Sequence, residues 1–300
     1  MNVLSVIAPI FIIFAVGFFG QKHLQLNTKT ASTLALYLMS PFLAFRTFYT
    51  QPIQEEFLYL CLYAAGLCFI LIGSVYLYGR VRRLQQKEIS ALVLSSAFMN
   101  NGNYGTPVIL FAFGSAGFDV AIMLMVIQQL LMSTVGIYTA ARGSESGGSV
   151  KPALKAVVRM PIAYGAFAGL ALQLSDVQLA IPLFNAIDLI ADAAIPTIML
   201  ILGMQLASIP WKFSDPQNLS VALITRLVLS PIVALGLTLL LPVDELTAAI
   251  MIIMAATPAA ANTTMFAIQY GAKPEFVSRV TLFSTVLSVV TVPIVLWLTT

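Results

Sequence analysis

Charged residues, histidine and cysteine are scarce in this sequence. Asp, Glu, Lys and Arg make up 9% of the 300 residues, whereas about 25% is usual in soluble globular domains. One histidine and two cysteines are too few for a His/Cys metal cluster, and the HExxH, P-loop and catalytic-triad patterns are absent. We therefore predict that the chain holds no metal and no cofactor and that it is not an enzyme.

Apolar residues dominate instead. Hydrophobic residues make up 59% of the chain, and the mean hydropathy is +0.94. A helix crosses the bilayer core with about 20 apolar residues, and runs of roughly that length recur between short polar turns. The sequence predicts an all-α integral membrane protein with ten transmembrane helices at 2–20, 31–49, 57–79, 89–114, 117–141, 155–174, 181–205, 218–241, 246–271 and 276–298.

The basic residues fall in alternate loops. Twelve of the fifteen Lys and Arg residues lie in one set of loops, and the other set holds acidic residues. Because cytoplasmic loops carry the excess of Lys and Arg, we expect both termini on the outer side of the plasma (inner) membrane. The basic residues are spread over several short loops, so nucleic-acid binding is not expected. The other three, Arg46, Arg159 and Arg226, lie within predicted helices.

The two halves of the chain resemble each other. Pro9 and Pro41 in the first half match Pro161 and Pro196 in the second half at nearly the same offset. With five helices in each half, the second copy enters the membrane from the opposite side, and such inverted repeats are typical of alternating-access transporters. A duplicated scaffold without transport, a channel, a membrane sensor and a membrane enzyme stay as alternatives. We predict a first repeat at 1–141, a cytoplasmic linker at 142–154 and a second repeat at 155–300.

Polar residues interrupt the fourth and ninth predicted helices near their centres, as NNGNYGTP over 100–107 and TPAAANTT over 257–264. Glycine and proline break the helical hydrogen-bond pattern, and unpaired backbone at that depth needs protein or water around it. We expect two broken helices that cross, with half-helix N-termini that bind an anion and carbonyl ends that could hold a cation. The alternative is a pair of simple kinks capped by asparagine. The predicted substrate-binding residues are Asn100, Asn101, Asn103, Tyr104, Pro107, Pro258, Asn262, Thr263 and Thr264.

Further polar residues lie inside predicted helices. Asp192 falls near mid-depth, where a carboxylate is costly unless paired, protonated or hydrated. It could couple transport to protons, but we favour pairing with a scaffold arginine, a dimer contact or Ser/Thr donors. Arg226 could attract the substrate, but we favour a side chain that extends to the cytoplasmic interface. Gln128 and Gln129 suit packing and substrate contact equally well.

The sequence resembles the auxin efflux carrier family over nearly its whole length. The strongest points are Asn100 with Gly105-Thr106-Pro107, and the stretch from Ala256-Thr257-Pro258 through Phe266-Ala267, Tyr270, Pro274-Glu275 and Ser278. The resemblance implies a secondary transporter of a small organic anion such as malate, malonate or an auxin-like acid. It also implies a mobile transport domain of helices 3–5 and 8–10 and a scaffold of helices 1, 2, 6 and 7, often dimeric. The short central loop and Thr264, which replaces a second proline, depart from the plant pattern.

A sodium-coupled carrier of the bile-acid symporter type shares the crossed-helix design and is the main alternative within transport. A denser cluster of acidic and amide residues beside the crossing would favour it, whereas Asn and Thr dominate that region here.

Overall fold

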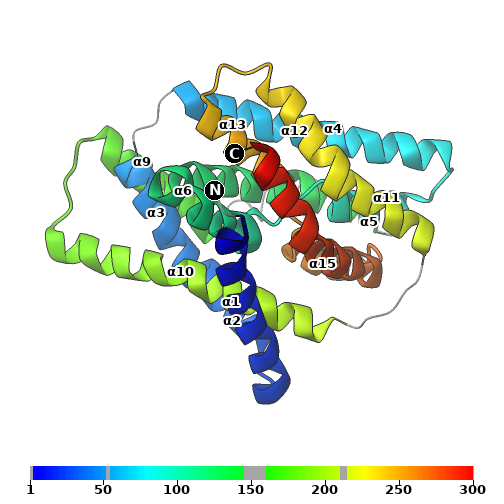
Figure 1. Cartoon of the computed structure of the whole chain (residues 1–300), viewed down its shortest axis with the longest axis horizontal. Helices are drawn as coiled ribbons and strands as arrows, with labels where there is room; N and C mark the ends of the chain where they lie inside the picture. The colour runs from blue at the N-terminus through cyan, green and yellow to red at the C-terminus, as the bar shows by residue number, and fades with distance from the viewer. Residues whose placement is uncertain (1–2, 52–54, 145–159, 210–214, 300) are drawn as a thin grey trace.

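The computed structural model describes residues 3–51, 55–144, 160–209 and 215–299, and most of these residues are helical (Figure 1). The described ranges contain no named strand, and their β-type pairing is confined to an isolated bridge between Met99 and Ala259. The prediction of an all-α protein is confirmed for this part of the chain.

The helices of the first part of the chain are α1 (Val3–Leu24), α2 (Thr28–Leu34), α3 (Ser40–Thr50), α4 (Glu55–Val81), α5 (Gln86–Ser96), α6 (Thr106–Leu131) and α7 (Ile137–Arg142). Those of the second part are α9 (Pro161–Leu174), α10 (Ile181–Ser208), α11 (Pro216–Ile224), α12 (Ser230–Thr238), α13 (Glu245–Ala255), α14 (Asn262–Tyr270) and α15 (Pro274–Thr299). Short π-helical segments lie at Ala35–Met39, Asn101–Gly105, Met132–Gly136 and Thr225–Leu229.

Several of these helices can span a bilayer. Within the described ranges, five segments are long and apolar enough to do so: Phe57–Val81, Asn101–Arg142, Ile181–Ser208, Pro216–Thr238 and Pro274–Thr299. The longest covers the end of the predicted fourth helix and the whole fifth. Gly114 breaks it between the two, with φ of +66° and ψ of −154°, a left-handed conformation that glycine adopts without strain.

The ten-helix count and the inverted repeat stay predictions. Residues 145–159 hold most of the predicted linker, the start of the predicted sixth helix and Arg159, and they lie outside the described residues. Residues 210–214, which include Lys212 of a predicted cytoplasmic loop, also lie outside the described residues.

Four helices pack with their backbones in direct contact. In Figure 1, α1 crosses α10 and α3 lies beside α9. A Cβ atom added at Gly17 of α1 would lie 2.1 Å from the carbonyl oxygen of Leu200 in α10, and one at Gly165 of α9 would lie 2.1 Å from that of Pro41. Only glycine permits so close an approach, which is a common way for membrane helices to pack. We call α1, α3, α9 and α10 the glycine-packed group.

A second group consists of α4, α5, α11, α12, α13 and α15, which lie next to one another. The hydroxyl of Tyr63 in α4 donates to the carbonyl of Met251 in α13 at 2.6 Å. Lys273, just before α15, forms an ion pair of 2.6 Å with Glu88 of α5. The interior of this group contains the two helix breaks described below.

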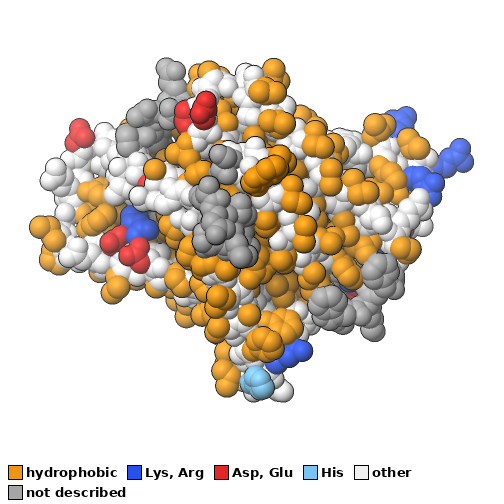
Figure 2. Space-filling model, viewed as in Figure 1, with side chains coloured by type: hydrophobic (Ala, Val, Ile, Leu, Met, Phe, Trp, Pro, Cys, Tyr) orange, Lys and Arg blue, Asp and Glu red, His pale blue; other side chains and the backbone are white. Residues whose placement is uncertain are grey.

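Hydrophobic side chains cover much of the face in Figure 2, and Lys and Arg gather near the ends of the molecule. Leu77, Leu239, Leu240 and Trp297 are each at least 66% exposed. Exposed apolar area of this extent is unfavourable in water and suits a lipid environment. Together with the apolar helices, this surface indicates a multi-pass membrane protein.

Candidate substrate cavity at the crossing of two broken helices

The first helix break lies earlier than the polar sequence suggests. Helix α5 ends at Ser96, residues 97–100 are not helical, and the π-helical segment Asn101–Gly105 leads directly into α6. Pro107 lies in the first turn of α6, after this segment, so it does not mark the break. The predicted interruption over 100–107 is therefore corrected to 97–100, because most of the polar stretch is helical and continues into α6.

The second break faces the first. Helix α13 ends at Ala255 and α14 begins at Asn262. The backbone N–H of Asn100 donates to the carbonyl of Pro258 at 2.9 Å, and that of Ala260 donates to the carbonyl of Phe98 at 3.0 Å. Each break thus satisfies backbone groups of the other, as buried polar backbone requires.

Arg226 connects the carbonyl ends of both first half-helices. Its side chain is fully buried, with 0% exposed. Nη1 donates to the carbonyl of Ser96, the last residue of α5, at 3.0 Å, and Nη2 donates to the carbonyl of Ala255, the last residue of α13, at 2.5 Å. The preference for a side chain that extends to the cytoplasmic interface is wrong, because the two carbonyl ends attract the guanidinium inward.

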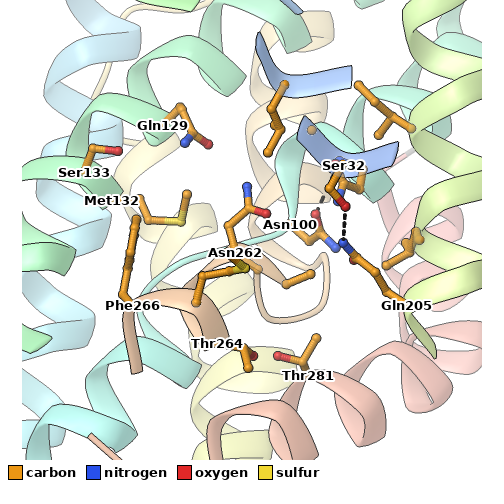
Figure 3. Close-up of a pocket in the computed structure, with 18 of the residues that line it drawn as sticks. Ser32, Asn100, Gln129, Met132, Ser133, Gln205, Asn262, Thr264, Phe266 and Thr281 are labelled. Carbon is orange, nitrogen blue, oxygen red and sulfur yellow. Dashed lines mark hydrogen bonds between the residues drawn. The ribbon is translucent and has the colours of Figure 1, made fainter. Parts of the chain in front are cut away.

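A cavity of about 990 Å³ lies beside the crossing. Its walls come from α2, the first break, α6, α10, α14 and α15, with the start of α9 at one edge. Figure 3 shows Gln129 and Asn262 extending into the same space. Its amide side chains are Asn100, Asn101, Asn103, Gln128, Gln129, Gln205, Asn262 and Gln269. Among the described residues, Lys29 is the one charged residue in the lining, and no Asp or Glu contributes.

Five of the predicted substrate-binding residues line this cavity and four do not. Those in the lining are Asn100, Asn101, Asn103, Asn262 and Thr264. Tyr104 is fully buried and packs against Phe14, with ring centroids 5.7 Å apart. Thr263 is also buried and donates to the carbonyl of Ala260 at 2.7 Å. Pro107 lies in the first turn of α6 and Pro258 in the second break, and neither belongs to the lining.

Two amide side chains in the lining have an N–H donor group without a hydrogen-bond partner. Asn100 is 4% exposed, and its Oδ1 accepts from the backbone N–H of Asn103 at 3.3 Å. Its Nδ2 is buried without a partner, and so is Nε2 of Gln128. A buried donor left unpaired costs about 1–3 kcal/mol, so a side-chain rotation that turned either N–H toward an acceptor oxygen of a ligand in the cavity would recover that free energy.

Sequence reasoning missed several residues of the opposite wall. Gln205 of α10 donates to the hydroxyl of Ser32 in α2 at 3.0 Å, and both line the cavity (Figure 3). Ser133 and Thr281 line it as well. These residues lie in helical segments outside the two breaks, and no local pattern distinguishes them from the Ser, Thr and Gln residues that serve helix packing.

Asp192 lies away from the cavity, in an ion-pair cluster. Arg46 Nη1 lies 2.7 Å from Asp188 and 2.5 Å from Asp192. The Asp192 side chain is 65% exposed. Of the roles considered for Asp192, the structure shows the one in which it pairs with an arginine. This ion pair links α3 to α10.

Comparison with known proteins gives the family. A family model described as "Membrane transport protein" matches residues 2–296. The chain belongs to this family. The resemblance to the auxin efflux carriers is thereby confirmed.

The relatives found by comparison are transporters by name. A Rhizobium meliloti protein named "Putative malonate transporter" is 27% identical over 89% of this chain and 85% of its own length. An "Uncharacterized transporter" of Methanothermobacter thermautotrophicus is 25% identical over 98% of this chain and 95% of its own. A transporter of Methanocaldococcus jannaschii, also named uncharacterized, is 24% identical over 98% of both chains.

Proposed function

We propose that this protein is a secondary transporter of a small carboxylate such as malonate or malate, which binds in the cavity beside the crossed helix breaks. The observation that carries the proposal is the pair of unpaired amide donors, Asn100 Nδ2 and Gln128 Nε2, in a lining to which the described part of the chain contributes no carboxylate. Membership of a transport family and the name of the Rhizobium relative support it.

The lining suits an anion that is bound by dipoles and released again. Neutral amides offer N–H donors without the strong attraction of a fixed cation, and the N-terminus of α14 at Asn262 adds a favourable helix dipole. Lys29 supplies one positive charge at the cavity edge. Hydrogen bonds to a charged group contribute about 1.5–3 kcal/mol each, so a few donors give moderate affinity.

The cavity lies between α9 and α10 of the glycine-packed group on one side and α6, α14 and α15 on the other, an arrangement that suits alternating access. Lys29, Met160 and Ser208 in its lining flank loops that the sequence predicts to be cytoplasmic. At the other end, Gln51 Nε2 donates to Asp119 Oδ2 at 2.7 Å between α3 and α6. We propose that the cavity opens to the cytoplasm here and that the Gln51–Asp119 contact closes the outer side.

The test is uptake of labelled malonate, malate and a monocarboxylate by purified protein in liposomes, beside binding to the protein in detergent. Asn100→Asp keeps the oxygen that caps Asn103 and removes the free donor, while it adds a charge that repels an anion. We expect malonate binding to weaken by more than about tenfold, which corresponds to about 1.4 kcal/mol or more.

Asn185→Ala is the matched control, because Asn185 is exposed on α10 and lies outside the cavity lining. It should bind and transport like the wild type. Unchanged malonate affinity in a folded Asn100→Asp variant would place the binding site elsewhere. Absence of uptake for every carboxylate would refute the proposed substrate class.

A further inference from the structure

The carbonyl ends of α5 and α13 meet at one buried guanidinium. Each end of a helix carries the equivalent of about half an elementary charge, negative at the C-terminus. Two such ends together present about one negative charge, which the single positive charge of Arg226 balances. Among the described residues, no carboxylate forms an ion pair with Arg226. The two carbonyl ends therefore take the place of the usual acidic partner.

The arginine is held by hydrogen bonds on both amino nitrogens. Besides the carbonyls of Ser96 and Ala255, Nη2 contacts the hydroxyl of Ser230, which itself donates to the Ala255 carbonyl at 2.8 Å. Thr225–Leu229 is π-helical, so Arg226 lies in a widened turn of its helix. Widened turns of this kind often occur at functional sites.

These carbonyl ends are where a cation-coupled carrier with broken helices would bind its ion. Here the guanidinium already makes those contacts. We propose that Arg226 is a permanent, covalently attached cation that takes the place of a coupling sodium ion, so that transport of the carboxylate needs no sodium. This inference rests on the proposed transport function. Arg226 acts as a positioning residue, since it lies outside the cavity lining and fixes the two breaks that form part of its wall.

The first measurement is the cation dependence of the wild type. Uptake of labelled malonate into liposomes is compared in sodium, potassium and choline chloride of equal concentration. We expect equal rates in all three, whereas a coupling ion typically changes affinity by about 5–150-fold. A rate that requires sodium would overturn the proposal.

The second measurement uses Arg226→Lys and Arg226→Gln, with Arg82→Gln as the matched control. Arg82 is exposed, and its Nη2 donates to Gln217 Oε1 at 2.9 Å, outside the cavity lining and the two breaks. We expect uptake to fall by about tenfold or more in Arg226→Gln, as for loss of hydrogen bonds to a charged group. Arg226→Lys should retain more activity, because it keeps the charge but lacks the fork that reaches both carbonyls. Wild-type uptake by Arg226→Gln would overturn the proposal.

A third measurement needs no substrate and so separates this inference from the proposed function. The melting temperature in detergent is followed for the wild type and Arg226→Ala with millimolar sodium, potassium or guanidinium chloride. We expect guanidinium to stabilise Arg226→Ala alone, by occupying the vacated position. Stabilisation of the wild type by sodium but not by potassium would refute the inference, and so would identical melting of Arg226→Ala and Arg82→Gln. If no carboxylate were taken up, the proposed function would be refuted. The melting temperatures would still test the role of Arg226, because they are measured without substrate.

Discussion

The two helix groups are joined internally in different ways. In the glycine-packed group, glycines bring one backbone onto another, as at Gly17 and Gly203, where an added Cβ would lie 2.1 and 2.0 Å from a carbonyl oxygen of the facing helix. In the second group, Gly73 and Gly236 face open space, and a Cβ at Gly66 would touch only the end of the Leu237 side chain. Backbone contacts resist sliding, whereas side-chain contacts can repack. The division into a rigid scaffold and a mobile transport domain stays a prediction, and the difference between the two groups gives a way to test it.

The largest expected effect concerns the rigid contacts. Gly17→Ala places a methyl group against the Leu200 carbonyl of α10, and neither backbone can yield locally. We expect the free energy of unfolding to fall by about 1–3 kcal/mol, as for overpacking of a core. Thermal unfolding in detergent measures the change.

Gly20→Ala on the same helix is the control, because no atom lies within 4 Å of an added Cβ there. It should be neutral or stabilising by up to about 1 kcal/mol, since alanine favours the helix. Equal destabilisation by both substitutions would show that the close contact with the Leu200 carbonyl is not the cause.

The sequence predicts the general design better than the local geometry. Apolar runs give the helices, and the Asn, Gly and Pro residues give the approximate breaks. The position of each break depends on partners far along the chain: Arg226 meets Ser96 130 residues away and Ala255 29 residues away. No local pattern contains those contacts. The same reason explains why Tyr104 and Thr263 face the protein interior while Gln205 and Thr281 line the cavity.

A second pair of substitutions separates the crossing itself from the proline beside it. Ser284→Ala removes the hydroxyl that accepts from the backbone N–H of Ala259 at 3.1 Å, in the second break. The buried N–H is then unpaired, which should cost about 1–3 kcal/mol of unfolding free energy and slow transport. Pro107→Ala should change stability by less than about 1 kcal/mol and keep transport near the wild-type rate, because the break lies before it.

Stability and liposome uptake, measured for both variants, decide this point. Loss of transport in Pro107→Ala with a stable fold would show that the proline, rather than the paired breaks, shapes the cavity wall.

The smallest expected effect is a pH dependence at the edge of the second group. The hydrogen bond from Lys273 is the main cause that holds the pKa of Glu88 below its usual value of 4.5. Because the folded pKa is lowered, the pair stabilises the protein above the unfolded pKa and the contribution is lost as the pH falls through the folded pKa. Both side chains are partly exposed, so the contribution is about 0.2–1 kcal/mol after solvent screening.

Glu88→Gln keeps the capping pattern at the start of α5 and removes the charge. Its melting temperature should fall below that of the wild type at pH 7, and the gap should narrow as the pH is lowered below about 4. Glu245→Gln, an exposed substitution in the first turn of α13, should not reproduce this narrowing. A constant gap between wild type and Glu88→Gln at every pH would mean that the Lys273 pair contributes nothing and that packing alone holds α5 to the start of α15.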